Sequence, residues 1–203
     1  MADESLLVVE PPFEPTRDAR VAGVVLAAGT STRFGDDNKL LADVDGQPLV
    51  RRAVAPFLDA AIDPVVVVVG HESDRVRAAL ASTAVQFVDN PAYVDGQATS
   101  VRVGVDAVAD ATLDAVVVGL GDMPFVRTRT VELLVAAYRA GAGDVLAAAA
   151  DGQRGNPVLF DASYADALRE LTGDSGARSL VLEHGTLVET GDPGVARDVD
   201  TPA

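Results

Sequence analysis

The sequence has no cysteine, a single lysine, few aromatic residues and no long apolar run. Without cysteine, the chain can form neither disulfide bonds nor thiolate metal sites. No stretch approaches the roughly 20 apolar residues of a membrane-spanning helix. The first 20 residues begin acidic and contain one apolar run of four residues, which is unlike a signal peptide. Because aromatic residues make up only 4% of the chain, the core must be built from Val, Leu and Ala. These absences predict a cytoplasmic protein.

Acidic residues dominate the charge of the chain. Its 31 Asp and Glu against 16 Lys and Arg give a formal net charge of −15 at pH 7. The acidic residues are dispersed, and no basic stripe could neutralise phosphates, which argues against a nucleic-acid partner. A dispersed acidic surface with almost no lysine favours a halophilic protein, because a salty cytoplasm screens the self-repulsion. The alternative is an ordinary acidic protein from a GC-rich genome.

Short apolar runs alternate with amphipathic segments, which predicts a mainly parallel sheet covered by helices. The length suits one α/β domain over residues 21–203, preceded by a flexible acidic extension over residues 1–20. The expected strands cover residues 21–27, 64–69, 85–88, 115–119, 145–149, 157–160 and 186–189. The expected helices cover residues 48–60, 73–81, 98–108, 128–140, 162–171 and 176–184.

A glycine- and hydroxyl-rich loop follows the first expected strand, where α/β sheets bind their ligands. It runs from Leu26 to Lys39 as LAAGTSTRFGDDNK and ends on the only lysine of the chain. Small residues let backbone N–H groups approach a polyanion, and the cations Arg33 and Lys39 would neutralise it. The loop is not a P-loop, because Gly29 and Gly35 are six positions apart, and it lacks the G-x-G-x-x-G fingerprint. It therefore predicts phosphate binding of another type.

The second chemistry-bearing segment is Gly121-Asp122-Met123-Pro124, directly after an apolar strand. A carboxylate at the end of a buried strand is well placed to hold a divalent cation. The alternative is that Asp122 caps the helix expected near Thr128, but it stands too far before that helix, and Thr128 could cap the helix itself. We therefore favour a metal-binding role.

These segments resemble signatures of the nucleotidyltransferases, and most closely those of the molybdenum cofactor branch of MobA-like and MocA-like proteins. The first loop is similar to L-A-[AG]-G-x-S-x-R-[FM]-G followed by lysine. GDMP resembles the family's metal motif, and Asp198-Val199-Asp200-Thr201-Pro202 resembles its closing D-[IV]-D-T-P. The resemblance implies that Asp122 and Asp200 hold Mg²⁺, with Mn²⁺ as the alternative. The fold it implies is a three-layer, Rossmann-like, mostly parallel α/β sheet with one reversed strand towards the C-terminal half.

Three further segments match the family in order. Residues 90–101 are similar to N-P-x-[YW]-x-x-G-[MQ]-x-[ST]-S-[LV], a loop entering a helix whose start could offer donors to an anion. Residues 154–158 and 173–178 are similar to R-G-[HN]-P-V and G-D-x-G-[AV]-R, which we place in glycine-rich turns. Asn156 stands where many relatives carry histidine, so an imidazole acid or base at that position is in doubt. The alternative for Arg154 and Arg178 is a pair of solvated surface cations.

The resemblance assigns roles to individual positions. It implies catalytic roles for Lys39, Arg33 and Asp122. It implies nucleotide binding for Leu26, Ala27, Ala28, Gly29, Thr30, Ser31, Arg33, Phe34, Gly35, Lys39, Asn90, Gly96, Ser100 and Gly121. It implies binding of the acceptor substrate for Arg154, Gly155, Asn156, Pro157, Gly173, Asp174, Gly176 and Arg178.

The function implied is transfer of CMP from CTP to the phosphate of the molybdopterin-type molybdenum cofactor, with release of pyrophosphate. Ala28, in LAAG rather than LAGG, resembles the cytidylyl-type branch. One alternative is transfer of GMP or another nucleotide to a different phosphorylated acceptor, such as a sugar phosphate or phospholactate. Another is a nucleotide-binding cofactor chaperone that serves a molybdenum hydroxylase without transfer activity. The presence of Lys39, Asp122 and Asp200 together disfavours the chaperone.

Overall fold

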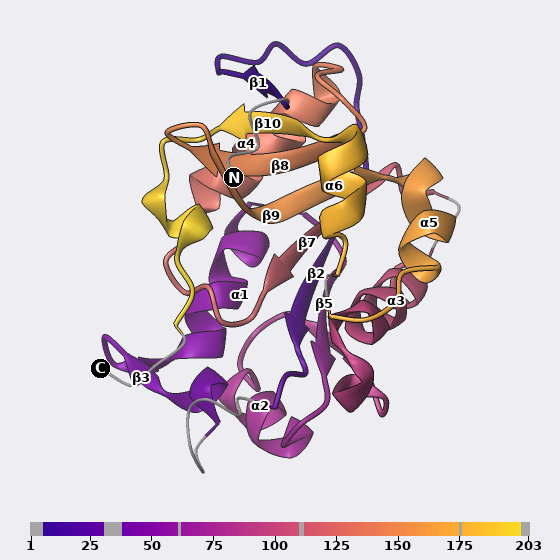
Figure 1. Cartoon of the computed structure of the whole chain (residues 1–203). Helices are drawn as coiled ribbons and strands as arrows, with labels where there is room; N and C mark the ends of the chain where they lie inside the picture. The colour runs from indigo at the N-terminus through magenta and orange to yellow at the C-terminus, as the bar shows by residue number, and fades with distance from the viewer. Residues whose placement is uncertain (1–5, 31–37, 61, 110–111, 175, 200–203) are drawn as a thin grey trace.

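An eight-stranded sheet forms the centre of the computed structural model, which describes residues 6–30, 38–60, 62–109, 112–174 and 176–199 (Figure 1). The strand order is β1-β10-β8-β9-β7-β2-β5-β6. These strands are β1 (Leu7–Val9), β2 (Val21–Ala27), β5 (Val65–Val69), β6 (Gln86–Asp89), β7 (Ala115–Leu120), β8 (Val145–Ala150), β9 (Gln153–Asp161) and β10 (Thr186–Glu189). A separate two-stranded ribbon consists of β3 (Asp43–Val44) and β4 (Gln47–Pro48).

One strand of the sheet is reversed within the described residues. β9 is antiparallel to both β7 and β8, and the other neighbours pair in parallel. The reversal follows from the two-residue turn Asp151-Gly152, in which both residues have positive φ, 52° and 73°. An Asp-Gly pair in this conformation gives the tight hairpin that antiparallel strands need. The predicted mostly parallel sheet with one reversed strand is confirmed.

Helices cover both faces of the sheet, which gives the three predicted layers. Val25 and Leu134 belong to the apolar cluster under one set of helices, and Val24 and Val101 to the cluster under the other set. Figure 1 shows α6 in front of β8 and α4 behind it. The first set is α1 (Leu49–Asp59), α2 (Ser73–Ala79) and α4 (Thr128–Arg139), and the second is α3 (Gln97–Ala107), α5 (Ala165–Arg169) and α6 (Arg178–His184). Short 3₁₀ turns are η2 (Lys39–Leu41), η3 (Tyr93–Asp95), η4 (Ala162–Tyr164) and η5 (Pro193–Ala196).

The expected helices are all present, with one change of type. The helix expected over residues 162–171 begins as the 3₁₀ turn η4 and is α-helical only in α5. Asp161 caps this turn, because its Oδ1 accepts the Ser163 N–H at 2.9 Å. In the part of the chain that the structure describes, no helix is long and apolar enough to cross a membrane.

The N-terminal segment differs from the expectation of a flexible extension. β1 pairs in parallel with β10, with Leu7 opposite Thr186. Further along, the N–H groups of Thr16 and Arg17 donate to the carbonyl of Arg139 at 2.9 and 3.2 Å. Residues 7–9 and 16–17 of the expected extension are therefore bonded to the rest of the domain. An apolar run can add an edge strand to a sheet, and the last carbonyls of a helix need partners that a polar segment can supply.

A buried tyrosine joins α4 to the end of β9. Tyr138 is 1% exposed, and its hydroxyl donates to Asp161 Oδ2 at 2.5 Å and to the Asp114 carbonyl at 2.8 Å. Burial and the Asp161 carboxylate raise the pKa of Tyr138 well above its usual value. Burial by itself would raise the pKa of Asp161, but hydrogen bonds from Ser163 and Tyr138 outweigh it and lower that pKa.

Tyr138→Phe should lower the free energy of unfolding by about 1 kcal/mol near neutral pH, the usual net value of one hydrogen bond. The pKa of Asp161 is lower in the folded protein, so its ionised form stabilises the fold above about pH 4, and this contribution is lost as the pH falls through the folded pKa. The difference in the free energy of unfolding between wild type and Tyr138→Phe should therefore shrink in acid. Urea unfolding at a series of pH values measures it, and a difference that stays constant or grows in acid would contradict this account.

Candidate functional site

The loops after β2, β5, β6 and β7 are joined by backbone hydrogen bonds at one edge of the sheet. Gly121 N–H donates to the Leu26 carbonyl at 2.8 Å, which extends the β2–β7 pairing by one residue. His71 N–H donates to the Ala28 carbonyl at 3.2 Å, and Asn90 N–H donates to the Val69 carbonyl at 2.8 Å. The structure thus brings together the segments that the sequence analysis singles out after these strands.

An ion pair between Lys39 and Asp122 lies at this edge. Lys39 Nζ donates to Asp122 Oδ2 at 2.7 Å, and the two side chains are 17% and 22% exposed. Lys39 is the first residue of η2, whose cap is Asn38, and the Asn38 Oδ1 accepts the Leu40 N–H at 3.0 Å. Two residues proposed as catalytic from the sequence are therefore in contact. Together they offer an ammonium that can neutralise a phosphate and a carboxylate oxygen that can hold a cation.

Glu72 supports the turn that carries Lys39. It follows β5 with a φ of 48°, a left-handed conformation that is costly for a residue other than glycine. Its carboxylate pairs with Arg75 at 2.7 Å. This hydrogen bond is the main reason why the pKa of Glu72 lies below its usual value. Burial acts in the opposite direction and raises the pKa, whereas a contact with Asn38 lowers it further. The strained residue thus connects the end of β5 to Asn38, next to Lys39.

Several predicted site residues lie outside the described residues: Ser31, Arg33, Phe34, Gly35 and Asp200. Of the first loop, Ala28 is 3% exposed, whereas Gly29 is exposed. A Cβ added to Gly29 would meet no atom within 4 Å. Packing within the protein therefore does not explain a glycine at this position.

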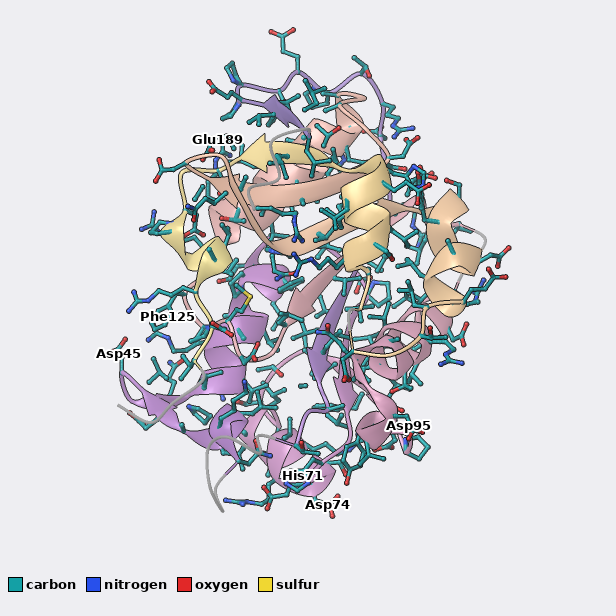
Figure 2. The ribbon with its side chains drawn as sticks, in the orientation of Figure 1. Asp45, His71, Asp74, Asp95, Phe125 and Glu189 are labelled. Carbon is teal, nitrogen blue, oxygen red and sulfur yellow. The ribbon has the colours of Figure 1, made fainter. Side chains whose placement is uncertain are left out.

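The C-terminal segment packs on the loop after β7. Val199 N–H donates to the Asp122 carbonyl at 3.1 Å. The Arg197 guanidinium lies 4.4 Å from the centre of the Phe125 ring, and Figure 2 shows Phe125 beside this descending segment. A Cβ on Gly194 would lie 2.1 Å from the Phe125 carbonyl oxygen, so only glycine fits there. The segment that leads to Asp200 is thereby held against Asp122.

The donor set fits a hard divalent cation in part. Asp122 supplies a carboxylate oxygen, the ligand type that Mg²⁺ and Mn²⁺ prefer. Residues 6–199, less the gaps given above, contain no group of three His, Asp or Glu side chains that could hold a metal ion by themselves. Asp200, which follows Val199, is the second carboxylate that the sequence indicates.

A cavity of about 230 Å³ opens on the face of the sheet covered by α3 and α6. Its floor is apolar, and Leu120, two residues before Asp122, is part of it. Four polar side chains line it: Gln97, Arg154, Asn156 and Arg178. Three of these are predicted acceptor-binding residues, and they come from β9 and α6, which are distant in sequence.

The strand expected over residues 157–160 is present, but it begins earlier, so residues 154–156 belong to β9 and not to the turn that we expected. Side chains alternate across a strand, so Arg154 and Asn156 line the cavity while Gly155 faces the other side. A Cβ on Gly155 would lie 2.0 Å from the carbonyl oxygen of Val195 in η5. Pro157 also faces this side, where it lines a small void together with Phe57. The hairpin with β8 is the cause, because its pairing extends β9 to residue 153.

Residues 173, 174 and 176 pack on the start of α3. The Gly173 carbonyl accepts the Ala98 N–H at 3.1 Å. Gly96 has φ 109°, and a Cβ on it would lie 2.7 Å from Asp174 Oδ1. Gly176 has φ 51°, and its Cβ would lie 2.6 Å from Gln97 Oε1. Gly96 thus allows residues 173 and 174 to approach α3 closely, and Gly176 allows Gln97 to do so.

The polar side chains at the start of α3 bond mainly to one another. The Asn90 amide donates to Thr99 Oγ1 at 2.8 Å and to Ser100 Oγ at 2.9 Å. Asn90 is 1% exposed and Ser100 is 5% exposed. These side chains fix the loop after β6 to α3, and nucleotide binding by Asn90 and Ser100 stays a prediction. Gln97 is the polar residue of α3 that lines the cavity, and Val101 of the same helix lines it too.

Two supporting residues were missed by the sequence analysis. Asn38 precedes Lys39, and a cap residue before a short helical turn is a recognisable signal. Asp192 is 2% exposed and precedes Pro193-Gly194, a turn signal that marks the loop without revealing that its carboxylate is buried. Asp45, Asp74 and Asp95, in contrast, project outward at the periphery in Figure 2, as a dispersed acidic surface requires.

Comparisons with known proteins agree with this geometry. The family model for the MobA-like NTP transferase domain matches residues 23–187. Nicotine blue oxidoreductase of Paenarthrobacter nicotinovorans is 32% identical over 190 residues, which cover 89% of this chain and 92% of that protein. The bifunctional protein GlmU of Koribacter versatilis is 36% identical over 127 residues, 61% of this chain and 26% of that protein. The chain thus matches about a quarter of that GlmU.

Solved structures share the fold over nearly the whole chain. Rv0371c of Mycobacterium tuberculosis H37Rv superposes with a TM-score of 0.79 at 28% identity, covering 91% of this chain and 95% of that one. A complex of Rv0371c with manganese superposes with a TM-score of 0.71 at 25% identity, covering 90% and 91%.

Gly155→Ala should lower the free energy of unfolding by about 2–3 kcal/mol, because the added Cβ meets the backbone of Val195, which cannot rotate away. Gly29→Ala is the matched control. Its Cβ meets nothing, so it should leave stability unchanged or raise it by up to about 1 kcal/mol. Urea unfolding compares the two, and a Gly155→Ala variant as stable as the control would contradict the packing of η5 on β9.

Proposed function

Because the chain belongs to the family of MobA-like NTP transferase domains and is a nucleotidyltransferase, we propose that it transfers CMP from CTP to the phosphate of molybdopterin cofactor. Pyrophosphate is the second product. The observation that carries the proposal is the Lys39–Asp122 ion pair together with a cavity lined by Arg154, Arg178 and Leu120, which stands two residues before Asp122. An anionic acceptor held in that cavity would extend past Leu120 to reach the ion pair.

The lining of the cavity suits a flat heterocycle that carries a phosphate. Its apolar floor can cover a ring face, and two guanidinium groups can pair with phosphate oxygens. The amides of Gln97 and Asn156 can donate to and accept from a ring edge. A pterin with a phosphorylated side chain has both features, which supports the proposed acceptor.

The nucleotide would bind at the loop after β2. Gly29 leaves room for phosphate oxygens to approach the backbone, since a Cβ there would meet no protein atom. The choice of CTP rests on Ala28 together with the segments over residues 154–158 and 173–178, all of which resemble the cytidylyl-type branch. Binding by Ser31, Arg33, Phe34 and Gly35, and catalysis by Arg33, belong to the same proposal.

The chain contributes position and charge to an in-line displacement. An oxygen of the acceptor phosphate attacks the α-phosphorus of the nucleotide, and the bond to pyrophosphate breaks, so no covalent enzyme intermediate is needed. Lys39 would offset the negative charge that develops on the α-phosphate and on the leaving group. A divalent cation held by Asp122 and Asp200 would supply further positive charge to the phosphate oxygens.

A relative favours a second candidate function. The protein named nicotine blue oxidoreductase matches nearly the full length of this chain, so a redox reaction on an organic compound in the same cavity is the alternative. A hydride donor such as NADH would then be consumed, and no nucleoside triphosphate would be cleaved.

Pyrophosphate should be released from CTP only when molybdopterin cofactor is present, in Mg²⁺ buffer. GTP, ATP and UTP are the comparison substrates, and NADH oxidation is followed in parallel. Molar and dilute KCl should be compared, because screening should favour activity of a chain with net charge −15. Release of pyrophosphate from GTP alone would overturn the choice of CTP. Release with a sugar phosphate or phospholactate as acceptor would overturn the choice of molybdopterin cofactor. Binding of a nucleotide without release of pyrophosphate would favour the chaperone.

Asp122→Asn should abolish transfer in a protein that remains folded, because the amide cannot hold a cation as a carboxylate does. Lys39→Ala should lower kcat by about 100-fold or more and KM for CTP far less, as expected for a group that acts mainly in the transition state. Asp45→Asn, an exposed partner of Arg52, is the control and should change neither. Full activity of Asp122→Asn would refute its role, and an effect of Lys39→Ala on KM alone would make Lys39 a ground-state contact.

A further inference from the structure

Asp192 is the most deeply buried carboxylate in the part of the chain that the structure describes. It is 2% exposed and lies after β10, outside the cavity and the Lys39–Asp122 ion pair. Burying a carboxylate costs several kcal/mol unless hydrogen bonds replace its water. A loop residue that is merely needed to turn the chain has no reason to bear that cost.

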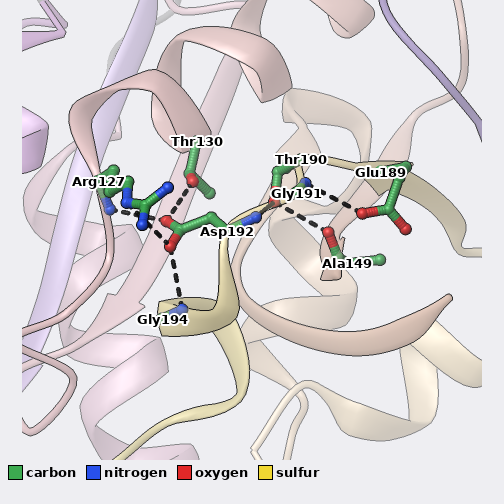
Figure 3. A network of polar contacts seen from close by, with 8 residues as sticks. All are labelled: Arg127, Thr130, Ala149, Glu189, Thr190, Gly191, Asp192 and Gly194. Atoms are coloured by element: carbon green, nitrogen blue, oxygen red, sulfur yellow. Dashed lines mark hydrogen bonds and ion pairs between the residues drawn. The ribbon is translucent and has the colours of Figure 1, made fainter. Parts of the chain in front are cut away.

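Three strong hydrogen bonds satisfy the Asp192 carboxylate (Figure 3). Oδ2 accepts the Arg127 N–H at 2.8 Å and the Thr130 hydroxyl at 2.6 Å. Oδ1 accepts the Gly194 N–H at 3.0 Å and lies 3.7 Å from Arg127 Nε. Arg127 is the cap residue of α4 and makes no cap bond with its own side chain. Asp192 therefore caps α4 from a distant part of the sequence and fixes the start of η5 at the same time.

The chain before Asp192 is also anchored. Thr190 donates its N–H and its hydroxyl to the Ala149 carbonyl at 2.8 and 2.9 Å. Gly191 N–H donates to Glu189 Oε1 at 3.0 Å. These hydrogen bonds fix the turn after β10 to the end of β8, and Asp192 is the first residue after that turn.

The chain after Asp192 runs to the metal-motif loop. Gly194 lies against Phe125, and Val199 N–H reaches the Asp122 carbonyl. In Figure 1 this yellow segment passes the ends of β8 and β9 on its way down from β10. The position of the whole segment depends on where Asp192 fixes its beginning.

We propose that Asp192 is a positioning residue for nucleotidyl transfer, which fixes residues 193–199 on the loop over residues 121–125. It touches neither substrate nor cation. Through Val199 it holds the backbone of Asp122. The effect on transfer rests on the proposed function, whereas the effect on the two segments does not.

The alternative role is that of a remote helix cap and nothing more. Loss of a cap costs about 1 kcal/mol and lowers stability without changing one loop selectively. Asp161 provides the matched comparison, because it is also a hydrogen-bonded carboxylate that caps a helical turn. It is bonded to Tyr138 and Ser163 at the end of the antiparallel strand β9, away from the loop after β7.

Asp192→Asn keeps the shape of the side chain but turns one acceptor oxygen into an NH₂ group that faces existing donors. Amide hydrogen exchange should become at least about tenfold faster in residues 121–125 and 194–199, because the segment loses its anchor. Asp161→Asn, with a similar loss of stability, should leave exchange there unchanged. Thr130→Val removes a single donor to the same carboxylate and should give a smaller change of the same kind, which keeps the test available if Asp192→Asn does not fold.

Mn²⁺ affinity, measured by titration calorimetry, should fall by about 10- to 100-fold in Asp192→Asn, the range seen for groups that support metal ligands, and should be unchanged in Asp161→Asn. kcat should fall with it, while KM for CTP changes little. Unchanged exchange over residues 121–125 in folded Asp192→Asn, or unchanged Mn²⁺ affinity, would overturn the proposal and leave Asp192 as a cap. A wild type that transfers no nucleotide would refute the proposed function, and the exchange measurement would still decide the role of Asp192.

Discussion

The hydrogen bond from Gly121 N–H to the Leu26 carbonyl is the constraint on which the arrangement of the site depends. It continues the β2–β7 pairing one residue beyond β7 and so places Asp122 beside the loop that begins at Ala28. A Cβ on Gly121 would lie 3.0 Å from the same carbonyl oxygen, so a small residue favours this approach. Lys39 then donates a hydrogen bond to the Asp122 side chain, and Val199 donates one to the Asp122 carbonyl. A short backbone contact thus determines where three distant segments converge.

Local patterns were sufficient for most of the sheet, because its central strands are apolar on both faces. The run Val65–Val69 is fully buried, and the bounds expected for β2 and β10 are those observed. β1 was missed because an edge strand depends on a partner strand at the far end of the sequence. Residues 154–156 were placed in a turn because glycine and polar residues conceal a strand whose hairpin register is set by β8.

The site was predictable where its chemistry is carried by motifs and unpredictable where it depends on burial. Lys39 and Asp122 were chosen by type and position, and the structure brings them into contact. Asn90 and Asp192 behave differently, because the partners that bury them come from other elements. No local signal distinguishes a polar side chain that meets a ligand from one that bonds within the protein, since both stand in loops after strands.

The alternation of β9 has a consequence for how such a protein can change over evolution. Arg154 and Asn156 line the cavity, whereas Gly155 and Pro157 face the opposite side. There Gly155 allows η5 to pack closely on β9. Changes in the lining of the cavity can therefore replace alternate residues of one strand without disturbing the packing of the C-terminal segment. The shape of the cavity and the packing of η5 are encoded in interleaved positions, so that one can diversify while the other is kept.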